Sequence, residues 1–94
     1  MIRRTVKIPN TLGMHMRAAN VFALAAARYG SVVRVTRGEL TVNGKSIMGL
    51  MMLAAPLGTR IVIEVEGVDE EKGVQELVDL VESGFGEGVN GGDA

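Results

Sequence analysis

The segment MRAANVFALAAAR at residues 16–28 organises the chain around one long helix. It is rich in alanine and contains neither glycine nor proline, a composition that strongly favours helix. Ala19, Phe22 and Ala26 recur at helical spacing, so we expect them to face the core. Gly30 follows the segment, and glycine is a common residue just beyond the end of a helix.

Alternation of apolar and polar residues on both sides of this helix predicts strands. The alternating segments are residues 2–8, 32–37, 40–42 and 61–66. A turn at Arg37-Gly38 joins the second and third of them into a hairpin. The side chains expected to face inward are those of Ile2, Val6, Ile8, Val33, Val35, Ile61, Ile63 and Val65.

Two further helices are predicted after the hairpin. Ser46 stands where an N-cap is expected, directly before the short apolar segment 47–53. Asp69 is expected to cap the last helix, with Glu70 and Glu71 well placed for its N-terminal dipole. Gly84 is the expected stop of that helix. Its apolar stripe consists of Val74, Leu77, Val78 and Val81.

The order strand, helix, strand, strand, short helix, strand, helix predicts an α+β fold with two layers. Four strands with one buried face need helices to cover that face. The 94 residues allow one domain at most. We expect that domain to span residues 1–86, and the glycine-rich, polar residues 87–94 to form a flexible tail.

The composition excludes several classes of function. The chain has ten basic and eleven acidic side chains, so no excess of positive charge favours binding to nucleic acid. Aromatic residues make up only 3% of the chain, too few to stack on bases. Cysteine is absent and His15 is the only histidine, which excludes disulfides and clusters of thiolate or histidine metal ligands. The N-terminus has no signal-like apolar stretch, and the apolar run 47–57 is too short to span a bilayer. We therefore expect a soluble, cytoplasmic protein that inserts in no membrane.

The first candidate for chemistry is His15, which lies between a loop and the alanine-rich helix. Helix N-termini carry unpaired N–H groups and partial positive charge, and they bind anions such as phosphate. Arg17 lies two residues further on and has donors suited to phosphate oxygens. This arrangement would suit a phosphorylated histidine. The alternative is that His15 merely begins a helix and Arg17 is solvated.

Ser46 and the methionine-rich segment after it are the other candidates. Ser46 could accept a phosphate, or it could serve only as an N-cap, and the two roles are compatible. A short helix cannot bury every face, so we expect Leu50 and Leu53 to point inward. Ile47, Met48 and Met51 should be at least partly exposed, where methionine suits a surface that meets several partners. The alternative is that the whole group belongs to the core.

Two motifs resemble those of a known family. The sequence GMHMRAA at residues 13–19 is similar to the active-site motif of the histidine-containing phosphocarrier (HPr) family of the phosphoenolpyruvate-dependent phosphotransferase system. KSIMGLM at residues 45–51 is similar to its regulatory serine motif. The resemblance covers about residues 2–86. It implies an open-faced β-sandwich, a four-stranded antiparallel sheet in the order βαββαβα, and a monomer.

The resemblance also implies a mechanism without a cofactor. His15 would take a phosphoryl group on Nδ1 from Enzyme I and pass it to a histidine of an enzyme IIA protein or domain. Arg17 would contact the phosphate, and Ile47, Met48 and Met51 would meet the partners. Ser46 would be the target of an HPr kinase/phosphorylase, and a phosphate there would weaken exchange with Enzyme I. Such a protein is a carrier, consumed and regenerated, rather than an independent enzyme.

The sequence departs from the common family pattern beside His15. Ala18 replaces a frequent proline, which would fix the first helical turn, and Met16 is larger than the usual alanine or threonine. Ala18 and the run 48–55 are more similar to nitrogen-branch members. An alternative is therefore a regulatory protein whose phosphorylation state controls partner binding rather than sugar uptake. A ligand-binding module without phosphorylation is a third class, although no residues point to a ligand pocket.

Overall fold

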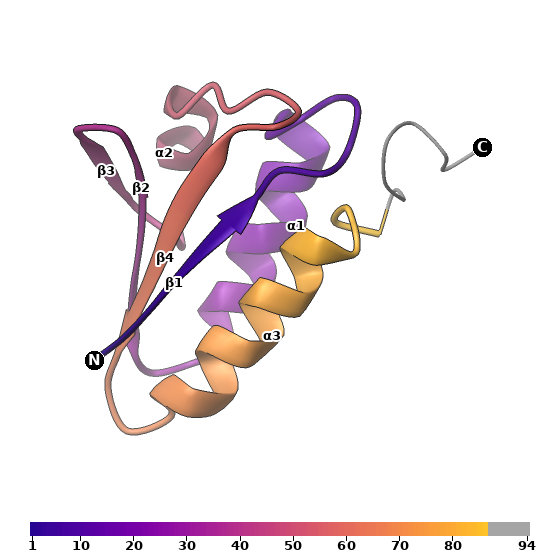
Figure 1. Cartoon of the computed structure of the whole chain (residues 1–94). Helices are drawn as coiled ribbons and strands as arrows, with labels where there is room; N and C mark the ends of the chain where they lie inside the picture. The colour runs from indigo at the N-terminus through magenta and orange to yellow at the C-terminus, as the bar shows by residue number, and fades with distance from the viewer. Residues whose placement is uncertain (87–94) are drawn as a thin grey trace.

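The computed structural model describes residues 1–86, which form a four-stranded antiparallel sheet and three helices (Figure 1). The strands are β1 (Ile2–Lys7), β2 (Val32–Arg37), β3 (Leu40–Asn43) and β4 (Arg60–Glu66). The helices are α1 (Met16–Ala27), α2 (Ile47–Met52) and α3 (Glu70–Glu82). The predicted βαββαβα order is confirmed. The predicted tail at residues 87–94 lies outside the described residues.

The sheet has the strand order β1-β4-β2-β3, so the strands at its centre are not consecutive along the chain. The β1–β4 pairing runs from Ile2 opposite Val65 to Lys7 opposite Arg60. Strand β2 pairs with β4 on one side and with β3 on the other, where the predicted hairpin forms. Both loops that carry the candidate residues, before α1 and before α2, therefore leave the sheet from its outer strands, β1 and β3.

All three helices lie on one face of the sheet (Figure 1). Helix α3 packs on β1 and β4 and beside α1, whereas α2 packs on β3 and α1. The predicted core of α1 is confirmed, since Ala19, Phe22 and Ala26 are buried. The inward-facing strand side chains are buried as predicted except Ile2, which is partly buried, as is Val78 in the stripe of α3.

The other face of the sheet carries polar side chains. Arg3 and Glu64 form an ion pair across β1 and β4. Arg34 of β2 lies between two carboxylates, 3.8 Å from Glu64 and 3.3 Å from Glu66. Alternation along each strand thus separates an apolar face under the helices from a charged face, as the family's open-faced sandwich implies.

Asp69 occupies the N-cap position of α3, as predicted, but the predicted capping by its side chain is wrong, because the carboxylate makes no capping hydrogen bond. The carboxylate instead accepts hydrogen bonds from the N–H groups of Gly30 (2.9 Å) and Ser31 (3.1 Å) and from the Ser31 hydroxyl. Glu70 serves the start of α3 by accepting the Gly67 N–H at 3.0 Å. Asp69 therefore ties the α1–β2 turn to α3.

This tie should make the stability of the fold depend on pH. The Ser31 hydroxyl and then the Gly30 N–H hold the pKa of Asp69 below its ordinary value, because they stabilise the charged carboxylate. A depressed folded-state pKa stabilises the fold above the unfolded-state pKa of about 4, and that contribution is lost as the pH falls through the folded-state pKa. Asp69→Asn should therefore lower the free energy of unfolding at neutral pH but much less in strong acid.

Urea unfolding of the wild type and Asp69→Asn, at neutral pH and at a pH well below the pKa values of carboxyl groups, measures the loss of stability under each condition. Asp79→Asn is the matched control, because Asp79 lies within α3 and its carboxylate accepts the Gln75 side-chain amide of the same helix at 2.9 Å. An equal loss of stability for Asp69→Asn at both pH values would contradict the electrostatic role of the tie.

Candidate functional site

His15 is the N-cap residue of α1. Its backbone is extended (φ −86°, ψ −179°), and its carbonyl accepts the Ala19 N–H at 2.8 Å to begin the helix. The imidazole makes no capping hydrogen bond to the helix and is partly exposed, while Arg17 is exposed in the first turn. The N–H groups of that first turn have no acceptor within the helix. His15 and Arg17 thus lie together at an electropositive helix end.

The loop before His15 is held by bonds on both sides. The Asn10 side-chain amide donates to the carbonyl of Gly13 at 3.0 Å, and the Gly13 N–H donates back to the Asn10 carbonyl at 3.1 Å. The Met14 N–H donates to the carbonyl of Ala55, in the loop after α2, at 2.8 Å. Asn10, Gly13 and Met14 are all buried. The backbone that presents His15 is therefore fixed against the rest of the fold rather than free in solvent.

Gly13 explains why this loop can pass so close to its neighbour. It has a positive φ of +66°, a conformation that favours glycine. A Cβ atom at this position would overlap the Ala55 carbonyl oxygen and lie 2.9 Å from Pro56 Cα. Gly13 was predicted to lie in a loop, but its packing role was not predicted, because its neighbours are about 40 residues away in the chain.

Ser46 occupies the N-cap of α2, as predicted. Its hydroxyl oxygen accepts the Gly49 N–H at 3.0 Å, and its carbonyl accepts the Leu50 N–H at 3.0 Å. The side chain is partly exposed. The capping role is therefore real, and the hydroxyl remains near the surface.

The helix after Ser46 divides its side chains as predicted. Leu50 and Leu53 are buried, whereas Ile47, Met48 and Met51 are 37%, 76% and 39% exposed. We call these last three residues the docking patch. Four further exposed apolar side chains were not predicted. Met52 and Leu57 lie in an unbroken apolar run, which has no periodicity from which to assign faces, and Leu12 and Met16 flank His15.

The structure places His15 and Ser46 near opposite ends of α2. At the Ser46 end, the Lys45 ammonium donates to the Tyr29 carbonyl, just after α1, at 2.7 Å. At the other end, the Met14–Ala55 bond brings the His15 loop beside the segment that follows α2. Helix α2 is six residues long, or about 9 Å at 1.5 Å per residue. A charge on Ser46 would thus be too far away to contact the imidazole. It would instead change the charge of the surface around α2, near whose other end His15 lies.

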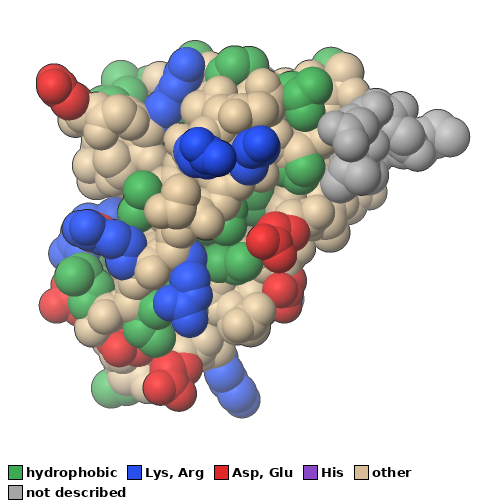
Figure 2. All heavy atoms as spheres, in the orientation of Figure 1, with side chains coloured by type: hydrophobic (Ala, Val, Ile, Leu, Met, Phe, Trp, Pro, Cys, Tyr) green, Lys and Arg blue, Asp and Glu red, His purple; other side chains and the backbone are tan. Residues whose placement is uncertain are grey.

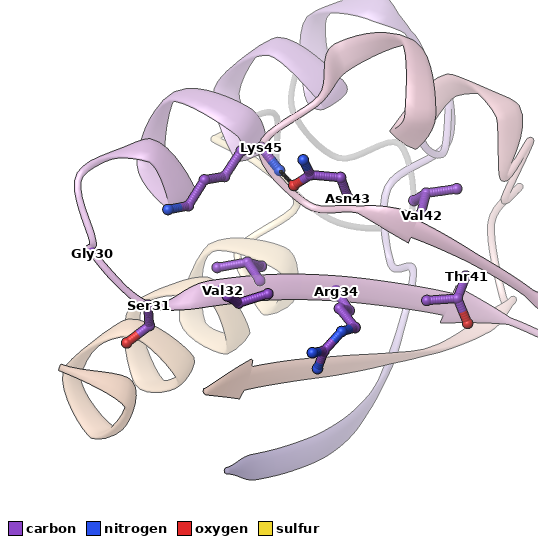
Figure 3. Close-up of a pocket in the computed structure, with 9 residues that line it drawn as sticks. Gly30, Ser31, Val32, Arg34, Thr41, Val42, Asn43 and Lys45 are labelled. Atoms are coloured by element: carbon purple, nitrogen blue, oxygen red, sulfur yellow. Dashed lines mark hydrogen bonds between the residues drawn. The ribbon is translucent and has the colours of Figure 1, made fainter. Parts of the chain in front are cut away.

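An open depression of about 510 Å³ lies beside Lys45 (Figure 3). It is bounded by β2, β3 and the α1–β2 turn, and Asn43 in its wall accepts the Lys45 N–H at 2.9 Å. His15, Arg17 and Ser46 are not among its lining residues. The candidate site is therefore a surface formed by helix ends and not a pocket for a small molecule.

The remaining surface does not suggest a different chemistry. Figure 2 shows basic and acidic side chains interspersed over the face that carries β1 and α3. Among residues 1–86, no group of three or more His, Cys, Asp or Glu residues is arranged to hold a metal ion. No helix in this part of the chain is long and apolar enough to cross a membrane.

The fold is an open-faced sandwich that presents one histidine at a helix N-terminus, and comparisons with known proteins give its class. Residues 2–83 match the family model described as "PTS HPr component phosphorylation site". The chain is 49% identical to phosphocarrier protein HPr of Neisseria meningitidis, over 94% of this chain and 99% of that protein. It is 46% identical to the Pseudomonas aeruginosa protein of the same name, over 88% and 93%.

Solved structures give the same result. The fold matches HPr of Thermoanaerobacter tengcongensis with a TM-score of 0.90 and 40% identity, covering 95% of this chain and all of that one. The chain belongs to the HPr family of the phosphotransferase system. It is a phosphocarrier protein of that system.

Proposed function

We propose that His15 is the residue that carries the phosphoryl group. A neutral imidazole nitrogen attacks the phosphorus of phosphohistidine on Enzyme I. A new N–P bond forms as the donor N–P bond breaks, and the departing imidazole keeps the electron pair. The accepting ring loses a proton and the departing ring gains one, so both rings end neutral. The reverse chemistry passes the group to a histidine of an enzyme IIA protein. The observation that carries this proposal is that the only histidine of the chain stands at the N-cap position of α1, within the matched family region.

Arg17 and the first-turn N–H groups have the role of holding the transferred group. The phosphoryl group carries negative charge in both the donor and the acceptor complex, so donors fixed at the helix end lower the barrier in both directions. Arg17 is exposed and can therefore turn toward a phosphate on His15. Its planar guanidinium can donate two parallel bonds to phosphate oxygens.

The docking patch serves the partner proteins. Ile47, Met48 and Met51 expose apolar surface on α2, beside α1. Methionine side chains adapt to differently shaped partners, which suits a carrier that must meet both Enzyme I and an enzyme IIA protein. A carrier between these partners would act in the cytoplasm, as a monomer that leaves one partner before it meets the next.

Transfer from the loaded carrier tests this function. The protein is phosphorylated with Enzyme I and phosphoenolpyruvate, separated from them, and mixed with an enzyme IIA protein from the same host. We expect the phosphoryl group to leave the carrier and appear on the enzyme IIA histidine. A carrier that accepts the group but delivers it to no enzyme IIA protein of that host would contradict the second half of the proposal.

Ser46 is the proposed regulatory site, and Ser46→Asp should raise KM for the carrier in transfer from Enzyme I. The added negative charge lies at the edge of the docking patch, where like charges on a partner repel it, and we expect roughly a 3- to 10-fold rise. Ser46→Asn is the matched control because asparagine also caps a helix but adds no charge. Steady-state transfer kinetics measure both variants, and equal KM values for them would argue against electrostatic regulation.

A further inference from the structure

The charged side chain of Arg37 binds backbone carbonyl groups rather than a carboxylate. Arg37 is the last residue of β2, and its Nη1 donates to the carbonyl oxygens of Leu53 and Ala54, both at 2.8 Å. Among residues 1–86 it forms no ion pair, whereas Arg34 on the same strand lies between Glu64 and Glu66. Hydrogen bonds from a charged donor are stronger than neutral ones. Arg37 therefore anchors the backbone at the C-terminal end of α2.

The anchored segment adopts a conformation that needs support. Leu53 is the C-cap of α2, and Ala54 has a positive φ of 49°, which is unfavourable for a residue with a Cβ atom. The Arg37 guanidinium binds the carbonyls of both residues. It thus holds the loop in a turn that alanine does not readily adopt alone.

The same loop holds the backbone of the acceptor histidine. Ala55 follows Ala54 directly, and its carbonyl accepts the Met14 N–H at 2.8 Å. Gly13 packs against Ala55 and Pro56 so closely that a Cβ atom would not fit. A displacement of residues 53–55 would therefore be passed to residues 13 and 14, and from there to His15.

We propose that Arg37 is a positioning residue for phosphoryl transfer, acting through residues 53–55 on the His15 loop. The proposal rests on the proposed function of His15, and Arg37 acts on it only through the carbonyls of Leu53 and Ala54. Its contribution is geometric. It keeps the His15 backbone where the imidazole nitrogen meets the phosphorus in line, and small misplacements at a reacting centre lower rates substantially.

Arg37→Met tests the proposal without requiring phosphorylation, because methionine keeps an apolar stem and removes the donors. We expect faster hydrogen exchange at the Met14 amide, by at least tenfold, and shifted backbone resonances at Met14 and His15. Arg34→Met is the matched control on the same strand, since it removes ion pairs on the opposite face of the sheet. It should leave these resonances and the exchange rate unchanged.

Transfer kinetics complete the test. For Arg37→Met we expect kcat for phosphorylation by Enzyme I to fall about 5- to 10-fold, with KM within twofold, because the docking patch is kept. Arg37→Lys should show smaller changes than Arg37→Met in both the Met14 exchange rate and kcat, because lysine keeps a charged donor. If Arg37→Met does not fold, Arg37→Lys takes its place in the test. If both variants keep normal Met14 exchange and kcat, and only the unfolding midpoint falls, Arg37 is a stabilising residue and the proposal is wrong. Failure of the wild type to accept phosphate would instead overturn the function of His15.

Discussion

Replacement of His15 by alanine should abolish acceptance of the phosphoryl group from Enzyme I and leave the fold intact. No other histidine is present in the chain to replace the lost nucleophile. The imidazole makes no capping hydrogen bond to α1, and the helix begins through the His15 carbonyl, which alanine retains. Intact-mass measurement after incubation with Enzyme I and phosphoenolpyruvate should show one added phosphoryl group on the wild type and none on His15→Ala.

A folding control keeps this result interpretable. The thermal unfolding midpoint of His15→Ala should lie within a few degrees of the wild-type value, since a substitution away from the core usually changes stability by less than about 1 kcal/mol. A folded variant that still gains one acid-labile phosphoryl group would refute the assignment of His15. Loss of phosphorylation together with loss of the fold would be resolved with His15→Gln, which preserves much of the side-chain volume.

Gly13→Ala should produce the largest loss of stability among single changes near the site. Alanine at a positive φ costs about 1–2 kcal/mol. The added Cβ atom also meets backbone atoms, the Ala55 oxygen and Pro56 Cα, which cannot turn aside as a flexible side chain would. Overpacking of this kind costs about 1–3 kcal/mol more, so urea unfolding should show a total loss of about 2–5 kcal/mol.

Gly38→Ala separates the two contributions. Gly38 has nearly the same positive φ, +60°, but a Cβ atom there has nothing within 4 Å. Gly38→Ala should therefore lower the free energy of unfolding only by the conformational cost of a positive φ, about 1–2 kcal/mol. Equal losses for Gly13→Ala and Gly38→Ala would mean that the contact between the His15 loop and residues 55–56 is not tight. Phosphorylation by Enzyme I should slow in Gly13→Ala only.

Local patterns predicted the elements and the candidate residues because their causes are local. Alternation along β4 buries Ile61, Ile63 and Val65 directly, and the alanine-rich segment forms α1. The N-cap at Ser46 also depends only on the residues that follow it. Motifs of this kind can be interpreted without knowing which distant segments of the chain lie beside them.

Contacts between distant segments could not be predicted in the same way. Asp69 has the sequence context of a cap, yet N–H groups of Gly30 and Ser31, 38 or more residues earlier, compete for its carboxylate. Arg37 was assigned to the end of a strand and the turn after it, but not to its backbone contacts, because its acceptors Leu53 and Ala54 lie 16 and 17 residues further on. The residues that present His15 at its site are therefore mostly ones that the sequence alone left in loops.

The fate of one phosphoryl group on the wild-type protein tests the role of His15 most directly. The purified chain is incubated with Enzyme I of the same host and phosphoenolpyruvate, and its intact mass is followed before and after brief acid treatment. We expect a single added phosphoryl group that is lost in acid, as for phosphohistidine, and that fragment-ion masses assign to His15. The absence of any modification with an Enzyme I that phosphorylates another HPr, or an acid-stable phosphate at another residue, would contradict that role.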